Sequence, residues 1–404
     1  LRSCPTLETP RQPMTGGSDP AEERPDGHLS QHPSGPHEHG HSVYEPGEFL
    51  DAPPEEAIPE REVSLARRLL NVRTLGSIAF GLILVFLLFR VILNVDFGRA
   101  FDLMRTANLG MLLAGLLAYY LTFPLRSLRW TLILRRVGSP VPYRAATEIL
   151  FLSWFVNCIV PAKLGDLYRA YLLRGNYGAS VSRTVGTIFI ERVTDIVVIF
   201  ALALAAGFWS FRGRDRPEVD ALFLAGFVFA VGLVLLVVAL RYQGRRLARL
   251  LPERLAELYE RFHEGSTGAL TPRVLLPVGA ITAAVWLLEG VRVYFVIHAL
   301  PLPDMQLGIS SSIFVALAAS LLSAIPLTPA GIGFVQAGIV GALNLYGVPP
   351  EAGTAVALTD FVLATLSVII LGGALYAVSP MIRRAHRAAP GAGGGPLADP
   401  DRAA

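Results

Sequence analysis

The sequence predicts an all-α protein: a polytopic integral membrane bundle of about eight transmembrane helices, with two re-entrant Pro/Gly loops and a possible internal repeat. Hydrophobic residues make up 52% of the 404 residues and charged residues only 17%, whereas a soluble domain carries about 25% charged residues. The mean hydropathy is +0.49, and apolar runs close to the ~20 residues that cross a bilayer recur along the chain. This composition excludes a disordered or coiled-coil protein and argues against an ordinary soluble enzyme.

The first 60 residues form an acidic tail that differs from the rest of the chain. They hold twelve Asp or Glu and three Arg, so their net charge is −9 against +3 for the whole chain. Eleven prolines and few large apolar residues predict disorder. We extend this tail through a juxtamembrane segment, to give a predicted region of residues 1–73. Five histidines between His28 and His41 are spaced loosely enough to chelate a metal, but a solvated His-rich tract is the favoured interpretation.

The predicted transmembrane domain covers residues 74–380, and a second disordered tail is predicted for residues 381–404. The domain contains eight apolar runs, of which the third is short for a membrane crossing. In order the runs are Leu75–Leu93, Leu109–Leu125, Ala145–Val160, Thr184–Trp209, Ala221–Leu240, Val274–Leu300, Leu307–Ile325 and Thr354–Val378.

Two stretches do not fit a simple membrane crossing. Residues 161–178 are too polar to face lipid, and residues 326–347 are apolar but broken by Pro and Gly. Irregular backbone at membrane depth must be buried in protein or line a wet cavity, so we predict two re-entrant loops. Pro161–Gly165 and Pro329–Gly333 share the pattern P-A-x-x-G. Matching interruptions in two halves of a chain indicate a transporter's binding site, although chance similarity between such turns is the alternative.

Residues 241–265 combine leucines at helical spacing with Arg and Glu on the opposite side. This pattern predicts an amphipathic helix, kinked at Pro252, that lies either in the membrane interface or against the bundle. Arginines that flank the first, second and last runs favour a cytoplasmic position for both termini. Eight crossings would place the Arg-rich loop of residues 241–273 outside, which is a conflict that the sequence leaves open.

Ionisable residues inside the apolar runs are candidates for function, because a charge in a membrane helix is costly unless it faces a cavity or a partner. Glu191 and Asp195 lie one helical turn apart, and Arg192 can reach Asp195. We predict that this cluster binds a charged head group or carries protons; the alternative is an internal ion pair that locks the helix to its neighbours. Asp360 has no basic residue nearby in sequence and is predicted to line the site.

Two other charged groups have structural interpretations that we favour. Glu289 and Arg292 are spaced to neutralise each other on one helix. Arg126 and Arg129 share a helix face, and with Trp130 they are predicted to form an interfacial anchor. Phosphate binding is the alternative for this pair, since the guanidinium group suits phosphate geometry.

The first Pro/Gly loop carries the strongest local signal. Lys163, Asp166 and Arg169 surround Gly165 in a segment that must be shielded from lipid. We predict that Lys163 and Arg169 hold a lipid phosphate and that Asp166 orients them or meets an amine.

The second Pro/Gly loop carries no charge. Gly331 and Gly333 allow close approach of backbone, and the following helix would present N–H groups to an anion. Thr328 is predicted to add a hydroxyl.

The string FVNCIVPAKLGDLYRAY, which contains Asn157, resembles the N-x-x-x-P-x-x-x-G-[DE]-x-x-R region of one family. That family is the lysylphosphatidylglycerol synthase transmembrane region, also called the flippase-like or UPF0104 family. Three more stretches are similar to the family's pattern: Arg126–Trp130, Glu191–Asp195 and Pro326–Gly333, the last with Gln336 where an acid is common. Together these stretches cover the predicted transmembrane domain.

The resemblance implies an integral membrane domain that, in multiple peptide resistance factors, moves aminoacylated phosphatidylglycerol between leaflets. Those proteins carry a C-terminal aminoacyl-transferase domain, and from the end of this chain we expect no lysyl transfer from tRNA. Other members stand alone or accompany glycosyltransferases. The implied partner is a membrane lipid: an anionic or aminoacylated phospholipid, or a lipid-linked sugar. A glycosyltransferase or synthase partner is possible on the same grounds.

The leading hypothesis is a multi-pass protein of the cell membrane that binds a lipid head group in a polar cavity and moves it between leaflets. An intramembrane lipid-modifying transferase and a scaffold that recruits an enzyme through the acidic tail are the alternatives. We expect no nucleic-acid partner, metal or cofactor, because the sequence offers no metal cluster and no nucleophile–base pair. The predicted substrate-binding residues are Arg126, Arg129, Asn157, Pro161, Lys163, Gly165, Asp166, Arg169, Glu191, Arg192, Asp195, Thr328, Pro329, Gly331, Gly333 and Asp360.

Overall fold

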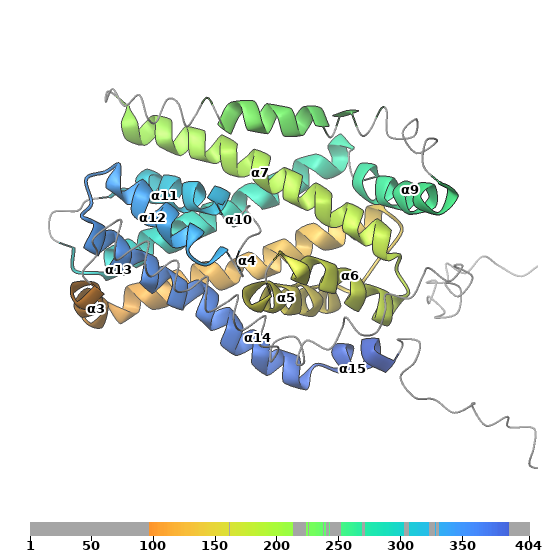
Figure 1. The fold of residues 1–404 in the computed structure, drawn as a ribbon, viewed down its shortest axis with the longest axis horizontal. Coiled ribbons are helices and arrows are strands. Elements are labelled where there is room, and N and C mark those ends of the chain that lie inside the picture. Colours follow the sequence, from red (N-terminus) through yellow and green to blue (C-terminus); the bar gives the residue numbers. More distant parts are fainter. Residues whose placement is uncertain are drawn as a thin grey trace, which may run out of the picture. The chain divides into compact units, whose positions relative to one another are not determined.

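Helices make up every regular element that the structure describes, which confirms the predicted all-α class (Figure 1). The first predicted run and the acidic tail lie outside the described residues, and the fifth run is described as a shorter helix, Gly226–Leu236. The computed structural model describes residues 97–160, 162–212, 224, 226–236, 238–239, 242, 252–268, 271–302, 307–322, 328 and 331–387, all within the unit Phe49–Ala404.

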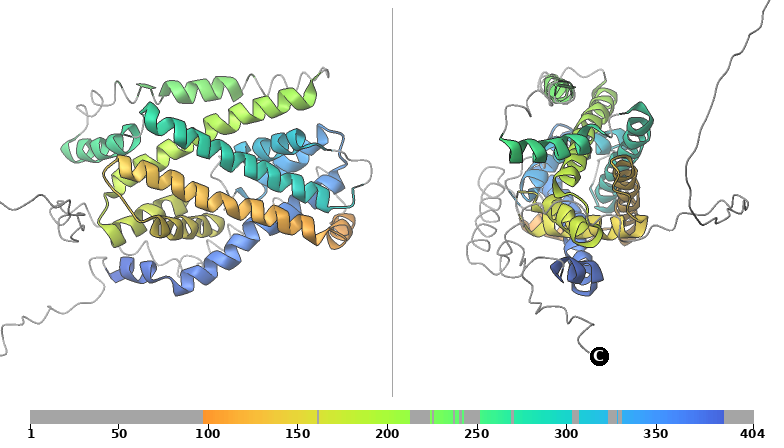
Figure 2. Two further views of the ribbon diagram at one scale, coloured as in Figure 1. Left: turned by 180° about the vertical axis from the view of Figure 1, so that it is seen from behind. Right: turned by 90° about the vertical axis from the view of Figure 1, so that its right-hand side faces the viewer.

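Three stretches are long and apolar enough to cross a membrane by length and composition. They are α4 (Leu109–Arg136), α10 (Pro272–Ala299), and a continuous run of α13 (Pro350–Phe361), the π-helical turn η4 (Val362–Leu366) and α14 (Ser367–Val378). A fourth helix, α7 (Val181–Phe211), has 31 residues and carries the buried acids Glu191 and Asp195. In the left view of Figure 2, α4 and α10 run side by side, while α7 and α14 cross them at an angle.

Helix α4 is longer than the sequence predicted. The second run was expected to end at Leu125, but α4 continues through Pro124 to Arg136. The residues after Leu125 include Arg126 and Arg129, whose side chains are 2% and 3% exposed. Their charges are neutralised inside the bundle, so they do not end the helix at a membrane surface.

Two pairs of shorter helices form hairpins within the bundle. The first pair is α5 (Tyr143–Ile159) and α6 (Leu164–Tyr177), and the second is α11 (Ile309–Leu322) and α12 (Phe334–Asn344). The connection inside each pair is one of the two Pro/Gly stretches. Each hairpin therefore begins and ends on the same side of the bundle, with its tip among the long helices (Figure 1).

The two hairpins open towards opposite ends of the bundle. The α5–α6 hairpin opens where α14 ends, because Ser379 donates a hydrogen bond to Glu148. The α11–α12 hairpin opens where α7 ends, because the rings of Phe211 and Tyr346 stack with centroids 4.8 Å apart. At that second end, Asn108 before α4 also donates its N–H to the last residue of α10.

We name the two ends by what they carry. The arginine-rich end holds the C-terminus of α4, the open end of the α5–α6 hairpin, and two further helices, α9 (Glu253–Thr267) and α15 (Pro380–Arg387). The α3 end holds α3 (Phe97–Arg105), which packs on α13. Described arginines that are wholly or partly exposed at the arginine-rich end are Arg135, Arg136, Arg144, Arg174, Arg183, Arg261, Arg273, Arg383 and Arg384.

Helix α9 is the described part of the predicted amphipathic segment. It begins directly after Pro252 and packs on α7 through two glycines. A Cβ at Gly186 would lie 2.3 Å from the Phe262 carbonyl oxygen, and a Cβ at Gly265 would lie 2.1 Å from the Arg183 carbonyl oxygen. This close approach supports the alternative in which the helix packs on the bundle, while Leu258 remains 41% exposed on its outer side.

The tail predicted to be disordered from residue 381 begins instead as α15. Ile382 and Ala385 lie three residues apart on one face and are 6% and 1% exposed. That face packs on α6, where Tyr171 donates a hydrogen bond to the Ala385 carbonyl oxygen at 3.1 Å. The disorder prediction is therefore wrong for residues 381–387, because it missed a short apolar face.

We predict that Gly186→Ala destabilises the protein, because the new methyl group must displace the backbone of α9. Overpacking of this kind costs about 1–3 kcal/mol. The matched control is Gly279→Ala in α10, where a Cβ would meet nothing within 4 Å. Alanine is the better helix former by up to about 1 kcal/mol, so this variant should be neutral or slightly stabilised. Thermal unfolding of both variants in detergent tests the packing, and equal melting temperatures would contradict it.

Candidate functional site

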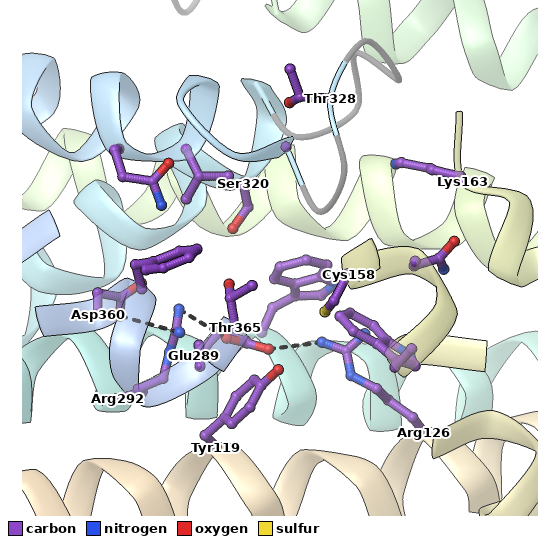
Figure 3. Close-up of a pocket in the computed structure, with 18 of the residues that line it drawn as sticks. Tyr119, Arg126, Cys158, Lys163, Glu289, Arg292, Ser320, Thr328, Asp360 and Thr365 are labelled. Atoms are coloured by element: carbon purple, nitrogen blue, oxygen red, sulfur yellow. Dashed lines mark hydrogen bonds and ion pairs between the residues drawn. The ribbon is translucent and has the colours of Figure 1, made fainter. Parts of the chain in front are cut away.

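A cavity of about 170 Å³ lies where the tips of the two hairpins meet the long helices. Helices α4, α5, α7, α10, α11, α12 and α13 all contribute to its wall, as do both hairpin connections and η4 (Figure 3). The ionisable or polar residues of the lining are Tyr119, Arg126, Asn157, Cys158, Lys163, Arg192, Glu289, Arg292, Ser320, Thr328, Gln336, Asp360 and Thr365.

Four buried charges form a continuous series along one wall, which we call the cavity chain. Arg126 lies 2.9 Å from Glu289, Glu289 lies 3.2 Å from Arg292, and Arg292 lies 3.1 Å from Asp360. Figure 3 shows the three pairs in line across the cavity. Two acids and two arginines make the cavity chain electrically neutral, which is how charges are tolerated in an apolar bundle.

Aromatic rings support the two arginines of the cavity chain. The Arg126 guanidinium lies 4.6 Å from the ring centroid of Trp154 and 5.3 Å from that of Trp286. The Arg292 guanidinium lies 5.2 Å from the ring centroid of Tyr119. These cation–π contacts add attraction in a desolvated setting and fix the planes of the guanidinium groups.

A second series of charges, which we call the α7 chain, centres on helix α7. Glu191 contacts both Arg169 at 2.7 Å and Arg129 at 3.3 Å. Arg129 also contacts Asp195, and Arg192 lies 3.6 Å from Asp195 on the same helix. The series ends where Arg192 reaches Asp166 of α6 at 2.9 Å. Its six members are Arg129, Asp166, Arg169, Glu191, Arg192 and Asp195, so three acids balance three arginines.

The connection from α5 to α6 is shaped by Asn157. Its Oδ1 accepts a hydrogen bond from the Gly165 N–H at 2.8 Å, and its Nδ2 donates to Asp166 at 3.2 Å. A Cβ at Gly165 would lie 2.1 Å from the Ser153 carbonyl oxygen, so only glycine fits where α6 begins beside α5. Asn157 thus ties the start of α6, and with it the α7 chain, to the end of α5.

The second connection is held by hydrogen bonds of its own. Thr328 donates to the Ile332 carbonyl oxygen at 2.9 Å, and Gln336 accepts from the Gly333 N–H at 2.6 Å. Gly331 and Gly333 have φ values of +69° and +92°, which glycine adopts without penalty. Gln336, which replaces a common acid of the family pattern, therefore has a structural task at the start of α12.

The structure brings most of the predicted site residues together around the cavity. Pro161 and Pro329 lie outside the described residues. Seven predicted residues line the cavity itself: Arg126, Asn157, Lys163, Arg192, Thr328, Gly331 and Asp360. Seven others stand behind this lining, as partners in the α7 chain or as glycines of the two connections: Arg129, Gly165, Asp166, Arg169, Glu191, Asp195 and Gly333.

The interfacial anchor predicted for Arg126 and Arg129 is wrong. Both side chains are nearly fully buried, and each pairs with acids from distant helices. Their partner Trp130 is also fully buried, with its ring 4.6 Å from the Arg169 guanidinium. Neither arginine has an acid nearby in the sequence, and the acids that neutralise them lie on α7 and α10.

Several lining residues were absent from the predicted site. Glu289 and Arg292 do contact each other as expected, but each also binds a second charge, and together they continue the cavity chain from Arg126 to Asp360. The sequence feature that could have identified Glu289 and Arg292 as lining residues was their position inside an apolar run. No sequence signal marks the π-helical turn η4, which follows Asp360 and carries Thr365 into the lining. Such turns are frequent at functional sites.

The fold and the cavity define a class: an all-helical membrane protein whose long apolar helices enclose an ion-paired polar cavity. Residues 75–372 match the family described as the lysylphosphatidylglycerol synthase TM region. This match extends over most of the chain, so the chain belongs to the lysylphosphatidylglycerol synthase transmembrane-region family.

Relatives in three organisms agree with this membership. A UPF0104 membrane protein of Methanocaldococcus jannaschii is 32% identical over 55% of this chain and 93% of its own length. A UPF0104 membrane protein of Methanothermobacter thermautotrophicus is 24% identical over 70% of this chain and 89% of its length. The glycosyltransferase AglD of Haloferax volcanii is 25% identical over 74% of this chain, which spans 53% of that protein.

We predict that Glu191→Gln strongly destabilises the protein, because it removes the carboxylate that Arg129 and Arg169 share. Breaking a buried ion pair from one side typically costs about 3–5 kcal/mol. The same change at Glu264, whose side chain is 55% exposed in its pair with Arg183, should cost less than about 1 kcal/mol. Thermal unfolding of the two variants in one detergent provides the comparison; a Glu191→Gln protein as stable as Glu264→Gln would refute the role of the shared carboxylate.

Proposed function

We propose that this protein binds a lipid head group in the cavity and moves it between the leaflets of the membrane. The observation that carries the proposal is a charged cavity enclosed by helices long and apolar enough to cross a bilayer. Ionisable groups at such a position are costly and mark pathways for polar or charged substrates. A lipid head group is the substrate that must cross this layer while its acyl chains stay in hydrocarbon.

The hairpins provide the two gates of the proposed pathway. The connection of the α5–α6 hairpin carries Lys163 to the cavity, and that of the α11–α12 hairpin carries Thr328 and Gly331 to it. Because the hairpins open to opposite ends, each tip separates the cavity from a different side. We infer that both are re-entrant in the membrane, and that displacing one tip at a time exposes the head group alternately to each leaflet.

The two ion chains have distinct tasks in this scheme. The cavity chain and Arg192 supply guanidinium groups whose geometry suits a phosphodiester. The α7 chain holds the α5–α6 hairpin to α7 through the Arg169–Glu191 and Asp166–Arg192 pairs. A bound phosphate beside Arg192 competes with Asp166 for the same guanidinium, and this competition couples head-group binding to movement of the first gate.

A lipid-linked sugar is a second candidate substrate. The observation that favours it is the similarity to AglD, a protein named as a glycosyltransferase, of which this chain spans 53%. In that case the protein would present the lipid-linked substrate of a partner glycosyltransferase. A phosphate at the membrane surface is common to both kinds of lipid, so the same cavity residues would bind either.

We further propose that the arginine-rich end faces the cytoplasm, in agreement with the positive-inside rule. The sequence placed the loop of residues 241–273 in conflict with this orientation, because it counted every run as a crossing. In the structure the hairpin pairs α5–α6 and α11–α12 each return to their own end, and α9 lies at the arginine-rich end beside the start of α7. One orientation then accounts for the α4–α5 turn, α9 and α15 together.

We predict that Asp166→Asn and Arg169→Ala each slow lipid movement by about tenfold or more, because each leaves a buried charge without its partner. The assay follows fluorescent phospholipid in proteoliposomes, with dithionite bleaching of the outer leaflet and no added donor substrate. Arg183→Ala, which removes an exposed ion pair with Glu264, is the control and should transport normally. Wild-type rates in both test variants would refute the site, and formation of a new lipid species only on adding a donor would instead indicate a transferase.

We predict the orientation from the labelling of two single cysteines. Ser139→Cys lies in the turn after α4, at the arginine-rich end, and Asn344→Cys is exposed at the end of α12, at the α3 end. In a background that lacks Cys4 and Cys158, an impermeant maleimide should label Asn344→Cys on intact cells. It should label Ser139→Cys only after the membrane is opened. The reverse pattern would overturn the proposed orientation.

A further inference from the structure

The charges around the cavity balance almost completely among the described residues. The cavity chain contains two acids and two arginines, and the α7 chain contains three of each. Each arginine of the cavity lining therefore already has an internal carboxylate. An anion bound by these arginines alone would add an uncompensated negative charge to a neutral set of buried side chains.

One cation is left over when both chains are counted. Lys163 lines the cavity, and it has no hydrogen bond or ion pair within the part of the chain that the structure describes. It is also the only lysine in the sequence. Figure 3 shows its side chain reaching from the first connection towards the side of the cavity that carries Thr328. The described cavity thus has a net charge of +1, located at the tip of the α5–α6 hairpin.

The backbone that presents Lys163 is held in an unfavourable conformation. Ala162 and Lys163 have φ values of +61° and +53°, and they are the only non-glycine residues with positive φ in the described ranges. Left-handed backbone is disfavoured for residues with a Cβ, and such conformations persist where the surroundings over-determine them, often at ligand clamps. Here Asn157 fixes the following turn through Gly165, so the lysine is positioned by the fold.

We propose that the cavity selects phospholipids whose head group carries one net negative charge, with Lys163 as the counterion of the phosphodiester. This inference rests on the proposed function and adds the substrate class to it. A single negative charge neutralises the described cavity. The phosphodiester of a zwitterion can also pair with Lys163, but its ammonium group then has no counterion, and a net cation adds still more unpaired positive charge. An unpaired charge in a low-dielectric site is unfavourable.

The acids of the lining explain why an ammonium group is excluded. Glu289 is shared between Arg126 and Arg292, and Asp360 is bound by Arg292. Neither carboxylate is available to a head-group amine unless an internal ion pair breaks. Among the other polar residues of the lining, Ser320, Thr328 and Thr365 carry hydroxyls whose oxygens can accept hydrogen bonds. They suit an uncharged, hydroxyl-bearing head group attached to the phosphodiester.

The test compares head groups in proteoliposomes that contain the full chain. Acyl-labelled phosphatidylglycerol, phosphatidylethanolamine and phosphatidylcholine are the probes, and their transbilayer movement is followed by dithionite bleaching. Wild type should move phosphatidylglycerol at least about tenfold faster than the two zwitterions, as expected for one charge pair in a partly shielded site. Lys163→Gln should reduce the ratio to about one, mainly through slower movement of phosphatidylglycerol, while Lys163→Arg keeps the preference. Arg183→Ala, which removes an exposed ion pair with Glu264 outside the cavity lining, should behave as wild type.

A binding measurement separates this inference from the proposed transport. Dihexanoyl-phosphatidylglycerol, dihexanoyl-phosphatidylcholine and glycerol phosphate are titrated into the detergent-solubilised protein. The readout is the change in tryptophan fluorescence, to which Trp154 and Trp286 of the cavity wall contribute. Preference for phosphatidylglycerol that is lost in Lys163→Gln supports the inference even if no lipid crosses the bilayer. Movement of all three labelled lipids at equal rates, unchanged in Lys163→Gln, would overturn the inference and leave transport standing. Equally tight binding of glycerol phosphate would overturn the assignment to a lipid.

Discussion

The need to neutralise every buried arginine is the constraint on which the rest of the structure depends. In an apolar bundle a guanidinium without a carboxylate is prohibitively costly, so Arg126, Arg129 and Arg292 dictate which helices must be neighbours. Arg126 and Glu289 join α4 to α10, and Arg292 and Asp360 join α10 to α13. Arg129 joins α4 to α7 through Asp195. The long helices are thus arranged around charge pairs, and the cavity is the space that those pairs enclose.

A second constraint, that buried backbone groups need hydrogen-bond partners, acts at the tips of the two hairpins. A hairpin tip inside an apolar bundle leaves backbone groups that lipid cannot satisfy. Asn157 and Gln336 supply side-chain oxygens to the N–H groups of Gly165 and Gly333, one at each tip. The two tips therefore use one device, an amide oxygen on a glycine N–H where the second helix of the pair begins. The two stretches thus share a side-chain hydrogen bond to a glycine N–H as well as the P-A-x-x-G sequence pattern.

The sequence predicted those features whose causes are local. Apolar runs located the long helices, and the Pro/Gly patterns located both hairpin tips, because hydrophobicity and backbone propensity act over neighbouring residues. It failed where the cause lies far along the chain. The partner of Arg126 is 163 residues away, so a buried pair looked like an interfacial anchor. The π-helical turn after Asp360 and the apolar face of α15 have no periodic signal long enough to detect.

The two ion chains are neutral and Lys163 adds one unpaired positive charge, and this charge balance bears on how the proposed transport would be driven. The acids and arginines of the cavity chain and the α7 chain pair with one another, which leaves Lys163 as the one charge of the described cavity without a partner. In the proposed mechanism, an entering phosphodiester would be stabilised first by Lys163 at the tip of the α5–α6 hairpin. It would then compete for Arg192, and the release of Arg192 from Asp166 would loosen that same hairpin from α7. Under this proposal, binding energy would move the gate only when the ligand carries the negative charge that neutralises Lys163. Selection of the ligand and gating would then depend on the same few side chains.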